Sequence, residues 1–295
     1  MRPSPLEKGM THVHSVDELA ARQFGVLAHW QLLEAGWSRK RIAHARRGLR
    51  SLHDGVWVTG AAPVTDIQRW WAATITAPRS ILSDFSAGAC WEMRPLSTTM
   101  LAITRPGSYG PRQYGTLRVR YSQRLDGDVT HRHGMAITTP ERTIIDLWPY
   151  LPPAAATRML REGIRLGRTE IPRMLAGLER HRGRRGTVSL AATVGVYARL
   201  PLDRCRSDAE VEGLLVLDAA GIRVPEVNVR IAGEEADFVW RDRRRIIEID
   251  GPQFHLDALE NARKTRIWTL AGCDVRRIPS DDVYRAPDRL IALAP

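Results

Sequence analysis

The spacing of apolar residues near the N-terminus predicts short helices followed by a hairpin. Apolar residues recur at helical spacing over residues 26–36, and a glycine at position 36 is a natural helix end. Ser38 can cap a further helix over residues 39–47. Residues 49–58 then alternate apolar and polar around Gly55. Helix, glycine turn, helix and hairpin is the element order of a winged helix-turn-helix, which we predict for residues 12–61.

The second of these helices is strongly basic. Long cationic side chains on a recognition helix reach phosphates and base edges in the major groove of DNA. The candidate DNA-binding residues are Arg39, Lys40, Arg41, His44, Arg46 and Arg47. A solvated basic face without a ligand is the alternative interpretation, and the glycine turn and the hairpin favour DNA binding over it.

Residues 62–200 have a mixed pattern that predicts an α+β middle region. Residues 101–104 and 117–121 alternate as strands, and Thr139 followed by a proline predicts the start of a helix. Residues 152–199 have helical character, interrupted by the basic, glycine-containing segment 181–186. That segment is either an exposed turn or a loop that contacts phosphates.

Residues 207–295 predict a separate α/β domain, with the boundary at residues 200–206. The order is helix, three strands, helix, strand and helix, and the third strand is apolar enough to lie centrally in a sheet. The whole chain is therefore expected to be an α/β multi-domain protein in which the C-terminal sheet is flanked by helices.

Three carboxylates carry the candidate chemistry of this domain. Glu248 and Asp250 share one face of a strand, and Asp237 lies on the adjoining strand of a hairpin. Carboxylates that are desolvated together repel, and a hard divalent cation relieves that repulsion. We therefore expect Asp237, Glu248 and Asp250 to bind Mg²⁺ or Mn²⁺, which would activate a water. His255 could act as a general base or donate to a departing oxygen.

Structural roles remain open for the same residues. Glu210, three positions after Ser207, could complete a capping box at a helix start. Glu248 or Asp250 could form an ion pair with a nearby arginine such as Arg245, which would make the cluster structural. His255 could equally be a structural histidine.

Charge narrows the choice of partner. The chain has 295 residues and a formal net charge of +11, which comes almost entirely from arginine. A GC-rich genome would favour arginine over lysine, but it would not create the excess of positive charge. Such an excess favours an anionic partner such as double-stranded DNA.

Other features of the composition favour a cytoplasmic location. The three cysteines form no CxxC pair, which argues against a disulfide framework and a cysteine zinc site. No apolar run is long enough to span a membrane, and the first residues lack the apolar core of a secretory signal. We expect a cytoplasmic protein without a membrane partner.

The C-terminal motifs resemble a known nuclease group. Segments 236–240 (ADFVW) and 247–255 (IEIDGPQFH) are similar to the DUF559 and very-short-patch-repair (Vsr) endonuclease group of the PD-(D/E)XK superfamily. The resemblance implies a restriction-endonuclease-like fold for residues 207–295, with Glu210, Asp237 and Glu248 around the metal. Asp250 stands where the superfamily often has lysine, and His255 matches a histidine that Vsr uses.

The N-terminal part resembles the AbiEi-type antitoxin domain. The matching segments are 24–26 (FGV), 31–33 (QLL), 55–58 (GVWV) and 138–147 (TTPERTIIDL). The resemblance implies a winged helix that binds DNA, represses its own operon and pairs with a nucleotidyltransferase toxin.

Three functions therefore remain to be distinguished. The leading hypothesis is a Mg²⁺-dependent DNA endonuclease that a winged helix targets to DNA. The alternative is a non-enzymatic, antitoxin-like repressor with an inactive nuclease fold. A third possibility is an antitoxin that binds a cognate toxin and no DNA.

Overall fold

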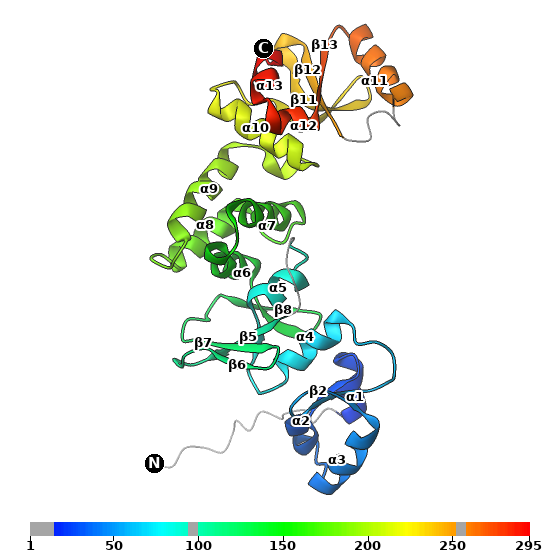
Figure 1. Cartoon of the computed structure of the whole chain (residues 1–295), viewed down its shortest axis with the longest axis vertical. Coiled ribbons are helices and arrows are strands. Elements are labelled where there is room, and N and C mark those ends of the chain that lie inside the picture. The colour runs from blue at the N-terminus through cyan, green and yellow to red at the C-terminus, as the bar shows by residue number, and fades with distance from the viewer. Residues whose placement is uncertain (1–14, 94–99, 252–257) are drawn as a thin grey trace, which may run out of the picture. The chain divides into compact units, whose positions relative to one another are not determined.

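The computed structural model of the chain describes residues 15–93, 100–251 and 258–295. These residues form a mixed α/β protein with three β-sheets, as expected at this coarse level (Figure 1). The chain divides into two compact units, Met1–Val188 and Ser189–Pro295. The division lies inside a helix, upstream of residues 200–206, where the sequence pattern predicts a boundary. In the described part of the chain, no helix combines the length and apolar character needed to cross a bilayer.

The first unit begins with short helices around a three-stranded sheet of order β1-β3-β2. Its hydrophobic core contains Leu32, Ile42 and Trp57. The predicted hairpin after the basic helix is confirmed as β2 and β3. The elements are α1 (Val16–Arg22), β1 (Val26–Ala28), α2 (His29–Glu34), α3 (Arg39–Ala45), η1 (Arg46–Gly48), β2 (Arg50–His53) and β3 (Val56–Val58).

The prediction of one helix over residues 26–36 is wrong in its first part. Residues 26–28 form strand β1, and Val26 pairs with Val58 of β3. Phe24 and Gly25 have φ angles of 55° and 81°, which end the preceding helix. Pairing with a strand about thirty residues further on therefore overrides the helical spacing.

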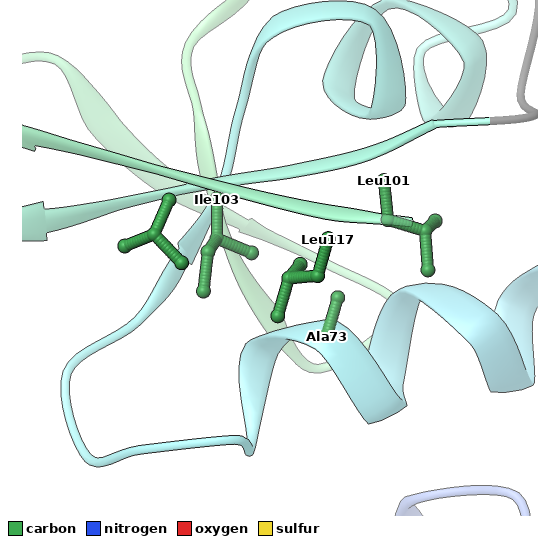
Figure 2. Close-up of a cluster of buried hydrophobic side chains, with 5 residues drawn as sticks. Ala73, Leu101, Ile103 and Leu117 are labelled. Carbon is green, nitrogen blue, oxygen red and sulfur yellow. The ribbon is translucent and has the colours of Figure 1, made fainter. Parts of the chain in front are cut away.

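A six-stranded mixed sheet of order β6-β7-β5-β4-β9-β8 forms the next layer of the first unit. Leu101, Ile103 and Leu117 are directed from the strands toward the helix that carries Ala73, and these residues form a buried cluster (Figure 2). The predicted strands at 101–104 and 117–121 are confirmed. The elements are α4 (Asp66–Thr74), β4 (Ile81–Leu82), α5 (Asp84–Cys90), β5 (Leu101–Pro106), β6 (Arg112–Tyr114), β7 (Leu117–Ser122), β8 (Val129–Arg132) and β9 (Met135–Thr138).

Helices follow this sheet along the chain. Thr139 caps the first of them by accepting a hydrogen bond from the Arg142 amide, as predicted. The helical region 152–199 contains an additional break at residues 166–170, where Gly167 has a φ of +63°. The elements are α6 (Pro140–Leu147), η2 (Trp148–Tyr150), α7 (Pro153–Arg165), α8 (Ile171–Arg180), α9 (Thr187–Arg199) and η3 (Leu202–Arg204).

The second unit contains a four-stranded sheet of order β10-β11-β12-β13. Its first three strands are antiparallel and β13 runs parallel to β12. The last helix of the predicted order is divided into two short helices, the first of which begins at Ser280. The elements are α10 (Asp208–Ala219), β10 (Glu226–Ile231), β11 (Glu234–Trp240), η4 (Arg241–Arg243), β12 (Arg245–Asp250), α11 (Ala258–Leu270), β13 (Asp274–Pro279), α12 (Ser280–Arg285) and α13 (Pro287–Leu293).

Helices cover both faces of this sheet (Figure 1). On one face, α10 approaches closely because Gly213 has no side chain. A Cβ there would lie 3.0 Å from Phe238 and 3.3 Å from Ile249. On the other face, Trp268 of α11 packs against Val239 and Ile246. Because side chains alternate along a strand, Glu248 and Asp250 share the α11 face with Ile246.

We predict that Gly213→Ala lowers the free energy of unfolding by about 1–2 kcal/mol, because the new methyl group overpacks the contact between α10 and the sheet. Gly195→Ala in α9 is the matched control, since a Cβ at that position meets nothing within 4 Å. The control is expected to be neutral or to stabilise by up to about 1 kcal/mol through helix propensity. Urea unfolding measures both, and equal effects of the two changes would contradict the close packing.

Candidate active site and basic surface

Asp237 and Glu248 lie side by side on β11 and β12. The paired register of the two strands extends to Phe238 and Ile247, the positions next to them. Beyond it, the Asp237 amide donates to Glu248 Oε1 at 3.0 Å, and the Ile249 amide donates to Asp237 Oδ2 at 2.8 Å. Each carboxylate therefore occupies a position where a backbone carbonyl would continue the ladder. The two side chains are held in fixed positions by the backbone of the opposite strand.

Burial makes this pair electrostatically unfavourable. Loss of hydration, together with the negative charges of Glu248 and Glu210, raises the pKa of Asp237 to about 8. Burial also raises the pKa of Glu248, although the Asp237 amide, Arg277 and Lys264 act in the opposite direction. The sheet therefore contains an acidic centre whose full ionisation costs free energy unless a cation is present.

Asp250 does not share this environment, because Arg277 neutralises it. Arg277 Nη2 lies 2.5 Å from Asp250 Oδ1, and its Nε lies 3.0 Å from Oδ2. The same Nη2 is 3.9 Å from Glu248 Oε2, and Nη1 donates to Thr265 Oγ1 at 3.2 Å. Arg277 thus joins β13, the carboxylates of β12 and helix α11. The structure does not bring Asp250 to the acidic centre as a third unpaired carboxylate.

The proposed ion pair with Arg245 is wrong. Arg245 pairs with Asp274 at 3.0 Å and also contacts the Leu293 carbonyl. The charged partner of Asp250 is Arg277, which lies on the neighbouring parallel strand directly opposite Glu248.

Glu210 is buried at the start of α10. Its Oε2 accepts hydrogen bonds from the Arg206 amide at 2.9 Å and from Asn228 Nδ2 at 2.6 Å. The Ser207 hydroxyl accepts a hydrogen bond from the Glu210 amide at 3.1 Å, so half of the predicted capping box is present. The carboxylate itself bonds outside the box, and its charge acts on Asp237.

The donor chemistry of the Asp237–Glu248 pair fits Mg²⁺. Among the described residues, no group of three or more His, Cys, Asp and Glu side chains could hold a metal ion. Mg²⁺ is commonly bound through one or two carboxylates while it keeps several waters, so a pair is sufficient in number. Asp237 and Glu248 would hold the ion. His255, the other candidate at this site, lies outside the described residues.

The six basic residues predicted to contact DNA are all exposed. Four of them belong to α3, whereas Arg46 and Arg47 lie on the short 3₁₀ turn η1 that follows. The guanidinium of Arg41 stacks over Trp37, 3.9 Å from the ring centroid. Ile42 anchors α3 in the core, so the charged face of the helix points to solvent.

Sequence reasoning missed Arg277 and Asn228. Arg277 sits on a strand with a second arginine beside it, and only the parallel register identifies which of the two faces the carboxylates. Asn228 has a φ of 49°, an unusual conformation inside a strand that its amide type tolerates. A polar residue in the middle of an apolar strand pattern was the available signal for Asn228.

Comparison with known proteins gives little further guidance. No protein-family model matches the chain, and no curated protein matches it. Among solved structures, the chain is similar to the RV2827C protein from Mycobacterium tuberculosis, with 17% identity and a TM-score of 0.39 over 60% of this chain and 74% of that chain. This weak similarity assigns neither a fold nor a function.

We predict that the second unit loses stability as the pH rises. The pKa of Asp237 is raised from 3.8 to about 8 by folding, so between these values the folded state binds more protons than the unfolded state. In EDTA, stability should therefore fall between about pH 5 and pH 8. Asp237→Asn should reduce this fall by at least about 1.4 kcal/mol, the equivalent of one pKa unit.

The measurement is urea unfolding at several pH values. Asp203→Asn, at an exposed aspartate of η3, is the matched control and should keep the wild-type pH dependence. If Asp237→Asn kept the wild-type pH dependence, folding would not raise the pKa of Asp237, and the prediction would be wrong.

Proposed function

We propose that the protein hydrolyses phosphodiester bonds in DNA with the help of Mg²⁺ or Mn²⁺. The observation that carries this proposal is the buried Asp237–Glu248 pair, whose carboxylates are fixed by backbone amides and raise each other's cost of ionisation. A divalent cation relieves that cost, and phosphodiester hydrolysis is a reaction that such a cation assists. The resemblance of the surrounding motifs to DUF559 and Vsr-like PD-(D/E)XK endonucleases supports the same assignment.

The roles of the residues follow from their contacts. One oxygen of each carboxylate is used by a backbone amide, which leaves Asp237 Oδ1 and Glu248 Oε2 to hold the ion. When bound, Mg²⁺ would lower the pKa of a coordinated water and stabilise charge on the phosphate. Arg277 orients Asp250 and places positive charge 3.9 Å from Glu248 Oε2, where an anionic substrate would approach.

The first unit supplies the proposed DNA-binding element. Helix α3 presents Arg39, Lys40 and Arg41 to solvent, and the β2–β3 hairpin follows it in the manner of a wing. Exposed arginines and lysines provide the phosphate contacts that dominate the affinity for duplex DNA. We interpret residues 16–58 as a winged helix of the AbiEi antitoxin type.

A non-enzymatic, DNA-binding repressor is the second candidate. The Asp250–Arg277 ion pair favours it, because a cation from the protein itself neutralises the carboxylate at the position where PD-(D/E)XK nucleases often carry lysine. In that case the second unit would be an inactive nuclease fold, and a toxin would be a further partner.

We predict that the purified protein nicks supercoiled plasmid in Mg²⁺ or Mn²⁺ and that Asp237→Asn/Glu248→Gln nicks it at least about 100-fold more slowly, because the metal would lose both of its charged ligands. The amide side chains can still accept the two backbone hydrogen bonds, so the fold is kept while the negative charge is removed. Asp203→Asn serves as the active control. If the double variant nicked the plasmid as fast as the wild type, Asp237 and Glu248 would not take part in the reaction. If neither the wild type nor any variant nicked it, the repressor would be favoured.

DNA binding provides a separate test of the first unit. Arg41→Ala/Arg46→Ala should weaken binding to duplex DNA and lower the slope of log K against log salt by about 0.9 for each phosphate that the variant no longer neutralises. Arg173→Ala, at an exposed arginine of α8, is the control and should bind like the wild type. Binding that is independent of salt would contradict the DNA interface and leave the toxin-binding antitoxin as the interpretation.

A further inference from the structure

A polar cavity lies in the first unit, on the six-stranded sheet. It has a volume of about 260 Å³ and is lined mainly by arginine and tyrosine. Arg118 and Arg120 come from β7, Arg142 from α6, and Arg184 from the basic segment 181–186. Tyr109, Tyr121 and Tyr150 line it as well. The carboxylate site of the second unit takes no part in it.

Two of the four arginines are held in place by two buried aspartates, one of them on α6. Arg142 donates to Asp128 Oδ2 at 2.6 Å and to Asp146 Oδ2 at 2.8 Å. Arg184 lies 2.8 Å from the other oxygen of Asp146. Because Asp128 and Asp146 are almost inaccessible to solvent, the guanidinium groups that they hold have fixed positions.

The other two arginines lie on β7. Arg120 is paired with the buried Asp84 at 2.8 Å. Arg118 lies two residues before it on the same face of the strand, and among the described residues it has no hydrogen-bond or ion-pair partner. Its charge acts on Asp84, which Arg120 already neutralises.

The charges in the cavity therefore do not balance. Three of the four arginines pair with three aspartates, so one positive charge, that of Arg118, is left over within the cavity. Arg185, outside the lining, adds another cation 5.8 Å from the centroid of the Tyr150 ring. Guanidinium groups in excess over carboxylates, three of them held by ion pairs, form an arrangement that recognises a phosphate group.

The tyrosines add a surface for a flat ring. Tyr109 and Tyr121 meet edge to face with ring centroids 5.1 Å apart. Tyr150 lies next to Arg120, whose guanidinium is 5.5 Å from the ring centroid. Aromatic rings and guanidinium planes provide the faces on which nucleobases stack.

We propose that this cavity binds a mononucleotide. The arginines would hold its phosphate, with Arg118 as the group whose charge no described residue pairs, and the tyrosines would contact the base. Small-molecule sites usually measure about 300–1,000 Å³, and this cavity of about 260 Å³ suits one nucleotide rather than a larger cofactor. Segment 181–186 then contacts phosphate through Arg184.

Isothermal titration of the full chain with AMP, GMP, CMP, UMP and inorganic phosphate tests the proposal. At least one nucleotide should bind saturably and more tightly than phosphate alone. Arg118→Ala should weaken that binding about tenfold or more, as expected for removal of a hydrogen bond to a charged group. Among the described residues Arg118 makes no hydrogen bond or ion pair, and Asp84 keeps its ion pair with Arg120, so this variant should unfold like the wild type.

Arg69→Ala is the control, because Arg69 is exposed on α4 and lies outside the cavity. If both variants bound the nucleotide equally weakly, the loss of affinity would come from the lower net positive charge of the protein, and the proposal would be overturned. The absence of binding by every nucleotide at millimolar concentration would overturn it as well. Displacement of the nucleotide by duplex DNA would also overturn it, since the cavity would then receive a phosphate of the DNA backbone.

Discussion

The second unit is organised by the burial of two carboxylates side by side in one sheet. Asp237 and Glu248 each accept a hydrogen bond from the backbone of the opposite strand, just beyond the end of the paired ladder. Because unpaired buried charges are costly, the neighbouring elements must provide positive charge to offset the repulsion between the two carboxylates. Helix α11 contributes the charge of Lys264, and β13 contributes Arg277.

In the first unit, the charge in excess is positive rather than negative. There, Arg142 is buried between Asp128 and Asp146, and further arginines gather around these carboxylates until positive charge is in excess. In both units the charged groups are fixed by hydrogen bonds within the protein, so a ligand meets a prepared arrangement. We propose a cation at one site and an anion at the other, because carboxylates are in excess at the first and arginines at the second.

Much of the local structure could be predicted from the sequence, because local signals determined it. The Thr139 cap, the hairpin after the basic helix and the strands of the C-terminal sheet agree with their turn residues and alternation. Val26 could not be assigned correctly, because its strand depends on Val58. The Asp250–Arg277 pair could not be predicted either, since it depends on the parallel register of β12 and β13.

The fold alone does not account for the acidic centre. Asparagine and glutamine at positions 237 and 248 could accept the same two backbone hydrogen bonds, and they would carry no charge to repel. The carboxylates satisfy the backbone no better than these amides, yet they cost free energy when both ionise, as the raised pKa of Asp237 indicates. A sheet that needed only structural hydrogen bonds would be more stable with amides at neutral pH. The negative charge is therefore best explained by a ligand that requires it, and a divalent cation is the ligand that this charge and these oxygen donors suit.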